Sequence, residues 1–211
     1  MTQYSADESQ FLRSRWLTPK GMKLRQEVID TVTSKADAWP ESIKAGAFPG
    51  SPIGPHPDFY TDLRGIDLSG LDLSKAEFCF SDVSLGDFKG CALVDSSFQC
   101  CLLNGTDFRG SDLTRSDLLQ ITTLGANFAN SVMVESVLMC ASLMTCSFEG
   151  ADLTGSMVDG SHFASCSMQG ANLNVKSSYP LKVSYSKRKN DDLGLPTMNP
   201  FGVTKHYFGA Q

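Results

Sequence analysis

Several features that mark enzymes, membrane proteins and exported proteins are absent from this 211-residue chain. It has no long apolar run and no start resembling a signal peptide, so we expect a soluble protein made in the cytoplasm, with no membrane partner. No phosphate-cradling glycine loop is present. The three histidines, His56, His162 and His206, lie far apart in the sequence, whereas a metal site or a nucleophile–base pair needs such groups clustered. We therefore expect no enzymatic activity, no cofactor and no metal.

Cysteine is not scarce, but disulfides are not expected. The seven cysteines contain no Cys-x-x-Cys spacing. Four fall at positions that the repeat described below reserves for small inward residues: Cys91, Cys101, Cys146 and Cys166. The other three, Cys79, Cys100 and Cys140, point outward or lie at turns. Reduced thiols in a reducing compartment are the expected state.

A five-residue period dominates the chain and runs from Asp62 to Asn174 without insertion or deletion. Every fifth residue from Leu63 to Leu173 is apolar except Thr123, over 23 positions in all. The residue two places before each of these centres is usually small, and glycine often stands two places after it. Such a fixed internal period predicts a solenoid, in which each repeat buries its large residue only by stacking on its neighbours.

The spacing also predicts the geometry of each repeat. A period of five fits neither a helix nor a strand alone. The small residue and the centre are two apart, so both point inward, while the residue between them points outward. The glycines allow the backbone angles of a tight bend. Phe88, Phe108, Phe128 and Phe148 recur every twenty residues, which predicts one stacked aromatic ladder and a coil of twenty residues.

The chain resembles the pentapeptide-repeat family, whose pattern is Ala-(Asp/Asn)-Leu-x-x. The segments that carry the resemblance best are 111–115, 126–130, 151–155 and 171–175, which read SDLTR, ANFAN, ADLTG and ANLNV. The resemblance implies an all-β solenoid, a right-handed quadrilateral β-helix with four repeats in each coil. The 23 centres would then give about 23 repeats and nearly six coils.

Four parts are expected along the chain: an N-terminal helical cap (1–45), a Pro/Gly-rich linker (46–60), the β-helix (61–175) and an irregular C-terminal tail (176–211). Ser5 with Glu8 fits a capping box, and Pro19 suits the first position of a second helix. We interpret the helices as a cap on the open end of the rod, because unpaired coil edges invite association. The alternative is a helix pair that binds a partner.

The tail contains two short patterns. The basic triplet 187–189 suggests contact with nucleic acid or membrane, but three charges favour a solvated or back-folded tail instead. No direct nucleic-acid partner is expected. Residues 179–185 alternate between apolar and polar and would fit against the rod as one extra strand.

The rod itself is acidic, which raises the possibility of DNA mimicry. Residues 61–175 carry 14 acidic and 5 basic side chains, a net charge of −9, and residues 176–211 carry 6 basic and 2 acidic ones, a net charge of +4. Some members of the family mimic DNA and bind DNA gyrase, and here Asp87, Asp107, Asp112 and Asp117 would form the acidic face. The simpler explanation is that ten of the 14 acids stand directly before a centre, where the family pattern itself places Asp. The tail also shows no helix of the kind through which gyrase-binding members pair.

An apolar group of outward residues is the second candidate surface. Counting in twenties places the following residues on two adjoining walls: Leu102, Leu119, Leu124, Val137, Met139, Met144 and Met157, together with Phe80 and Leu85; Val132 and Val134 extend the group onto a third wall. A contiguous apolar group on a soluble rod is usually covered. The cover is either the chain's own flanks, through Phe11, Trp16 and Trp39, or a protein partner or second copy.

Three functions remain open from the sequence. The first is a non-enzymatic protein–protein interaction scaffold, or a homodimer, working through the apolar walls. The second is a gyrase- or topoisomerase-binding DNA mimic that protects against topoisomerase poisons. The third is a secreted effector or toxin-immunity component.

Overall fold

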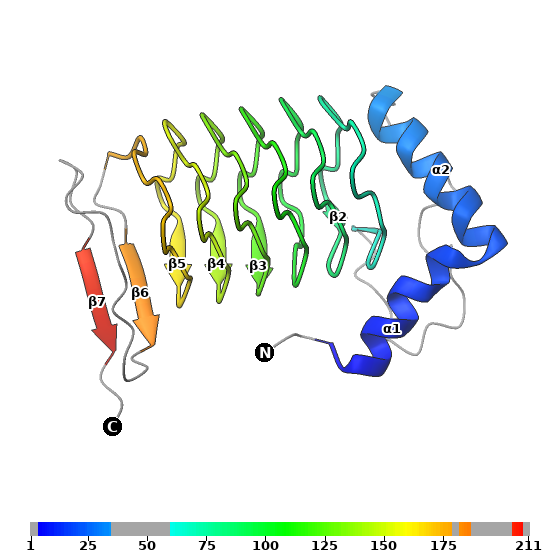
Figure 1. Cartoon of the computed structure of the whole chain (residues 1–211), viewed down its shortest axis with the longest axis horizontal. Coiled ribbons are helices and arrows are strands. Elements are labelled where there is room, and N and C mark those ends of the chain that lie inside the picture. The colour runs from blue at the N-terminus through cyan, green and yellow to red at the C-terminus, as the bar shows by residue number, and fades with distance from the viewer. Residues whose placement is uncertain (1–3, 35–59, 179–181, 187–203, 209–211) are drawn as a thin grey trace.

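The structure, a computed structural model, describes residues 4–34, 60–178, 182–186 and 204–208. It forms a rod of stacked coils with a helical unit at one end and two longer strands at the other (Figure 1). The helical unit contains α1 (Ala6–Ser14), the single 3-10 turn η1 (Arg15–Leu17) and α2 (Pro19–Ser34). The strands are β1 (Thr61–Asp62), β2 (Ser81–Asp82), β3 (Thr122–Leu124), β4 (Ser142–Met144), β5 (His162–Ala164), β6 (Lys182–Ser186) and β7 (Thr204–Phe208).

Successive coils pair in parallel with a step of twenty residues, as the spacing of the phenylalanines predicts. Four columns of paired residues run along the rod, one on each side. We name these sides after a residue in each column: wall A contains Asp107, wall B Asp112, wall C Asp117 and wall D Thr122. β1 and β2 form one short sheet and β3 to β7 another, each in chain order, and both belong to wall D. The predicted β-helical solenoid is confirmed.

Each repeat turns its corner through the same backbone conformation. The residue two places after a centre has positive φ for every centre except the last, Leu173, at ten glycines and at twelve other residues. The centre's carbonyl accepts a hydrogen bond from the residue three places on, as Phe108 O does from Ser111 N at 3.1 Å. The positive-φ residue donates its own N–H to the next coil, as Arg115 does to Val134 O at 2.8 Å. These inter-coil bonds help to offset the strain of a left-handed non-glycine residue, which is about 1–2 kcal/mol.

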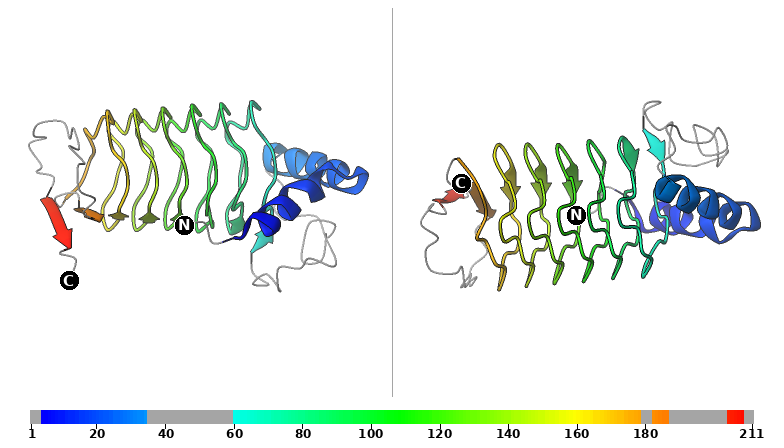
Figure 2. Two further views of the ribbon diagram at one scale, coloured as in Figure 1. Left: turned by 60° about the horizontal axis from the view of Figure 1, so that its bottom comes forward. Right: turned by 90° about the horizontal axis from the view of Figure 1, so that it is seen from above.

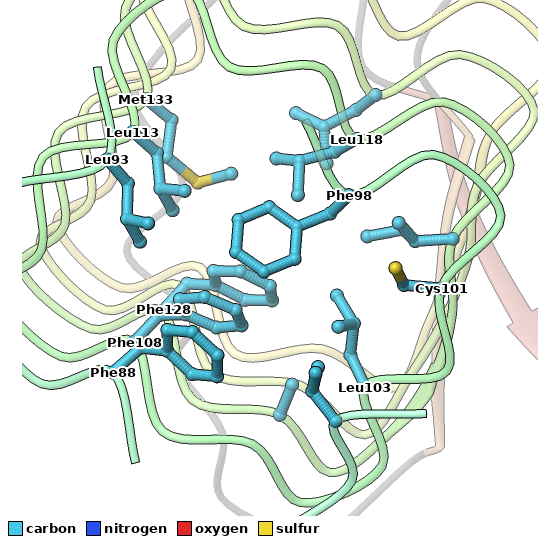
Figure 3. Close-up of a cluster of buried hydrophobic side chains, with 14 of the residues drawn as sticks. Phe88, Leu93, Phe98, Cys101, Leu103, Phe108, Leu113, Leu118, Phe128 and Met133 are labelled. Carbon is cyan, nitrogen blue, oxygen red and sulfur yellow. The ribbon is translucent and has the colours of Figure 1, made fainter. Parts of the chain in front are cut away.

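The repeat centres fill the interior of the rod. None of the 23 centres is more than 5% exposed. The predicted aromatic ladder is present, and Figure 3 shows Phe88, Phe108 and Phe128 stacked on one another. The ring centroids of Phe88 and Phe108, and of Phe108 and Phe128, are 5.1 Å apart, and those of Phe128 and Phe148 are 4.9 Å apart. Offset stacking of this kind adds to the free energy of burial. Thr123, the polar centre, is buried and donates its hydroxyl to Leu103 O at 2.9 Å.

The helices pack against the first coil of the rod (Figures 1 and 2). The capping box of Ser5 and Glu8 is formed at the start of α1, and α2 begins at Pro19, as predicted. Trp16 and one face of α2, with Leu24, Val28 and Val32, join the core of the rod. The open end of the first coil is therefore closed by apolar contact.

A buried ion-pair network also holds the helices to the rod. Asp62 accepts hydrogen bonds from Arg15 at 2.8 and 2.9 Å and from Arg64 at 2.9 Å. Trp16 Nε1 donates to Arg64 O at 2.8 Å. Burial alone would raise the pKa of Asp62, but hydrogen bonds and charges from Arg64 and Arg15 hold that pKa well below its ordinary value. The carboxylate is thus an ionised anchor between the first coil and the helices.

The expectation of an irregular C-terminal tail is wrong for two segments. β6 pairs in parallel with β5, with Val183 opposite Phe163, and supplies the extra strand expected near residues 179–185, of which 179–181 lie outside the described residues. β7, which was not predicted, pairs with β6 at a step of 22 residues, with Thr204 opposite Lys182. An unpaired strand edge is a template for a further strand, whether or not the five-residue pattern continues. The linker 46–59, Trp39, His56 and the triplet 187–189 also lie outside the described residues.

Candidate protein-binding surface

The outward apolar residues of the third to fifth coils lie together, as predicted. On wall C, Val137 is in register with Met157, and on wall D, Leu124 is in register with Met144. We call this surface the apolar side, which comprises Leu102, Leu119, Leu124, Val132, Val134, Val137, Met139, Met144 and Met157. Coil stacking creates the surface, because residues twenty apart become direct neighbours.

Three of these side chains are well exposed. Met144 is 43%, Val132 40% and Met157 38% exposed, while the remaining six are half-buried against their neighbours. Single exposed apolar residues are ordinary on soluble proteins, but a contiguous group is typical of an interaction surface. Methionine adds adaptability, since its flexible side chain fits different partner shapes.

The expectation that Leu85 belongs to this exposed group is wrong. Its side chain is only 4% exposed and packs over Gly105 of the next coil. Tyr4 lies against the same part of wall D and hydrogen-bonds with Arg64 and Ser84. Tyr4, which precedes the N-cap residue of α1, thus contacts the second coil, and the five-residue period did not predict this contact.

Phe80 is exposed but stands apart from the apolar side. It belongs to the first coil and is 53% exposed. Its backbone holds the coils together, since Thr61 N donates to Phe80 O at 3.1 Å. Phe80 therefore serves as an exposed apolar reference residue outside the candidate surface.

The expected covering residues from the helices do not lie over the apolar side. Trp16 is buried at the end of the rod, beside Arg64. Phe11 belongs to α1, which lies at the helical end of the rod, away from β4 with its Met144 (Figure 1). Trp39 lies outside the described residues.

The four acidic candidates lie on three walls and not on one face. Asp87 and Asp107 are in register on wall A, Asp112 is on wall B and Asp117 is on wall C. Asp107 is also paired with Arg109 two residues away, so part of its charge is neutralised.

These aspartates have a local structural function. Asp87, Asp107, Asp112 and Asp117 each accept a hydrogen bond from the backbone N–H two residues on, at 2.9–3.0 Å. Asn127 makes the same bond to Ala129 N at 3.0 Å. A side-chain oxygen before a centre can therefore hold the bend without a negative charge, although apolar residues such as Val132 and Val137 occupy the same position in other repeats.

No group of three or more His, Cys, Asp or Glu that could hold a metal occurs in the described part of the chain. Burial raises the pKa of the Cys91 thiol to about 11, and that of Cys101 is raised even further by the same cause. Among the same residues, no helix has the length and apolar character needed to cross a bilayer.

The chain matches a family model and is similar to several solved structures. The family model of pentapeptide repeats matches residues 91–120 and 146–174 in eight copies. The chain is similar to the solved structure of QnrB1, a plasmid-mediated fluoroquinolone resistance protein, at 21% identity and a TM-score of 0.36, over 67% of this chain and 77% of that one. It is also similar to HetL from the cyanobacterium Nostoc, involved in heterocyst differentiation regulation, at 17% identity and a TM-score of 0.24, over 59% and 72% of the two chains.

A third similar structure is a pentapeptide repeat protein from the thylakoid lumen of Arabidopsis thaliana, at 28% identity and a TM-score of 0.19, over 53% of this chain and 68% of that one. The comparison with curated proteins finds no match.

Proposed function

We propose that this chain, a pentapeptide-repeat protein, is a non-enzymatic scaffold that binds a protein partner through its apolar side. The observation that carries the proposal is the apolar group on wall C, formed by Leu119, Val137, Met139 and Met157, which Val132 extends onto wall B and Met144 onto wall D. A partner that covers these side chains would remove apolar area from water without deforming the scaffold, at about 25 cal/mol per Å² of area buried.

A binding role is favoured over catalysis because the polar groups of the coils serve the backbone. The aspartates before the centres hold the bends, and inward serines such as Ser111 donate to carbonyls, here to Phe108 O at 2.7 Å. The high pKa of buried thiols such as Cys91 keeps them protonated near neutral pH, so they are poor nucleophiles.

The test is capture of partners from an extract of the source cells by the immobilised full chain, followed by mass spectrometry. The variant Met144→Gln, Met157→Gln removes exposed apolar area without adding charge, and both side chains already contact solvent. Phe80→Gln is the matched control, since it removes an exposed apolar side chain elsewhere. Circular dichroism and thermal unfolding verify that all three proteins are folded.

Specific partners that are lost with the double variant and kept with Phe80→Gln would support the proposal. Identical partner sets for the three proteins would refute it. Sedimentation of the purified chain tests the related possibility of a homodimer, which the double variant should then dissociate.

DNA mimicry with DNA gyrase as partner is the less supported alternative. Its four candidate acids hold bends, and Asp107 is also paired with Arg109. It would require inhibition of gyrase supercoiling that weakens steeply with salt and with Asp107→Asn, Asp112→Asn and Asp117→Asn combined. An effect independent of salt and charge would end this alternative.

A further inference from the structure

The part of the rod that carries the apolar side, except for Leu102, contains no lysine or arginine. Residues 116–175, three coils in length, hold five acidic residues and no Lys or Arg, with His162 as the single histidine. The acidic residues are Asp117, Glu135, Glu149, Asp152 and Asp159. The charge near the apolar side is therefore of one sign.

Four of these acids border the apolar side. Asp117 is in register with Val137, and Asp152 is in register with Val132. Glu135 occupies the corner between walls B and C, directly after Val134, and Asp159 follows Met157 by two residues. Glu149 is next to the wall A column and does not border the apolar side.

A hollow of about 630 Å³ lies at the same border. It is lined by Val134 and Met157 from the apolar side and by Glu135, Asp159 and Lys176 among its polar residues. A long side chain with an apolar stem and a cationic tip, such as Lys or Arg, suits a hollow of this composition.

Among the described residues, protein cations compensate this border only in part, since Arg115 lies close enough to Glu135 to interact with its charge. Arg115 binds Asp95 through two hydrogen bonds of 2.7 and 2.8 Å. Asp117 accepts its hydrogen bonds from neutral donors, Leu119 N and Gln99 Nε2, and Asp152 does so from Thr154. Lys176, in register with Met157, is the cation that bounds the C-terminal edge.

The walls of the rod cannot accept a partner strand. Their backbone groups are used between coils, as in the bonds from Leu118 N to Val137 O and from Leu138 N to Met157 O, both 2.7 Å. A partner must therefore bind by side-chain contact, and an amphipathic helix presents an apolar stripe for this purpose.

We infer that the apolar side binds a cationic amphipathic helix of another protein, with its apolar stripe on Val134, Val137 and Met157 along the edge between walls B and C and its Lys or Arg residues toward Asp117, Glu135 and Asp152. Complementary charge at the rim guides association and selects the partner. The same acids repel anionic membranes and nucleic acids. They also oppose an isologous pairing with a second copy, which would bring like charges together. The inference rests on the proposed function and specifies its partner.

Two synthetic peptides test the inference directly. Both are helical and carry the same Leu/Met stripe, but one has Lys and the other Glu at its polar positions. Binding to the full chain is followed by fluorescence anisotropy at low salt. We expect the Lys peptide to bind at least about tenfold more tightly than the Glu peptide, and the difference to shrink at high salt.

Charge variants locate the effect on the surface. The triple variant Asp117→Asn, Glu135→Gln, Asp152→Asn should weaken binding of the Lys peptide about tenfold. Asn at the two aspartate positions preserves the turn, as Asn127 does naturally. The matched control is Asp72→Asn, Glu77→Gln, Asp87→Asn, which removes the same charge from the first two coils and should change binding less than about twofold.

Each outcome decides between the inference and the proposed function. Equal loss with both triple variants would mean attraction to net charge alone and overturn the inference, as would equal binding of the two peptides. If Met144→Gln, Met157→Gln weakens both peptides while the rim variant weakens neither, the apolar side binds a partner that is not cationic, and only the inference fails. If the methionine variant changes no binding at all, the apolar side is not the surface and the proposed function fails as well.

Discussion

The first and second halves of the rod share one interior but differ in their exterior. The stack formed by Phe88, Phe108, Phe128 and Phe148 passes through both halves without a break. Outside, residues 61–115 carry nine acidic and five basic side chains, whereas residues 116–175 carry five acidic and no Lys or Arg. The fold therefore constrains the inward positions of every coil and leaves the outward positions free to differ.

The two halves also end differently. The first coil is closed by α2 and anchored through Asp62, while the last coils continue into β6 and β7. A substitution in the shared interior should thus lower the stability of the whole rod. A substitution at the anchored end should lower stability mainly by weakening the contact between the helices and the first coil. Four predictions separate these effects, from the largest to the smallest.

Removal of a stacked ring should have the largest effect. Phe108→Ala leaves a cavity between Phe88 and Phe128 and should lower the free energy of unfolding by about 3–5 kcal/mol. Phe80→Ala, which truncates an exposed ring of the first coil, should cost less than about 0.5 kcal/mol. Urea denaturation measures both. Similar losses for the two variants would contradict the continuous interior.

Loss of the Asp62 anchor between the helices and the first coil should cause the second-largest loss of stability, and the size of this loss should depend on pH. Asp62→Asn leaves two buried arginines without their counter-charge and should cost about 2–3 kcal/mol at neutral pH. Because Arg64 and Arg15 lower the pKa of Asp62 in the folded state, its contribution is complete above the unfolded pKa of about 3.9 and is lost as the pH falls below that value. The difference in stability between wild type and variant should therefore narrow from about pH 5 to about pH 2. A constant difference across this range would show that the charge of Asp62 is not responsible.

Two glycines with the same backbone conformation should respond differently to alanine. Gly110 has φ +64 and open space around it, so Gly110→Ala should cost about 1 kcal/mol from the left-handed conformation alone. Gly65 has φ +73, but an added Cβ would lie 2.5 Å from Leu12 O in α1. Gly65→Ala should therefore cost more than Gly110→Ala and should displace the helices. Equal thermal shifts for the two variants would mean that α1 does not press on this corner.

The smallest effects concern the inward serines. Ser111 Oγ donates to Phe108 O at 2.7 Å, so Ser111→Ala should cost about 1 kcal/mol. Ser116 Oγ is buried and has no hydrogen-bond partner among the described residues, so Ser116→Ala should be neutral or slightly stabilising. Parallel thermal melts compare the two. A larger loss for Ser116→Ala would indicate a partner for its hydroxyl.

Much of the fold could be predicted because a fixed five-residue period determines which side chains point inward and which residues of successive coils become neighbours. The inward centres, the twenty-residue coil, the aromatic ladder and the small inward cysteines all follow from counting along the chain. The apolar side followed in the same way, since Val137 and Met157 become neighbours once the coil length is known. The start of α1 was predictable from the local hydrogen bonds of Ser5 and Glu8.

The remaining features depend on contacts that no period describes. Leu85 occupies an outward position, yet packing over Gly105 and coverage of its wall near Tyr4 bury it. β7 forms at a step of 22 residues because β6 offers an open edge, and the repeat had already ended. The acids of the rod could be counted from the sequence, but only their hydrogen bonds to the backbone explain why asparagine serves equally well at Asn127.

The sequence by itself determined the direction in which each side chain of the repeat points, because the alternation of small, polar and large residues every five positions permits only one way of burying the centres. The tertiary structure alone decided which outward residues stay exposed, through the contact of the N-terminal segment with wall D and the anchoring of α2 on the first coil. Burial inside a repeat is set by local spacing, whereas exposure outside depends on whatever distant segment comes to lie against the wall.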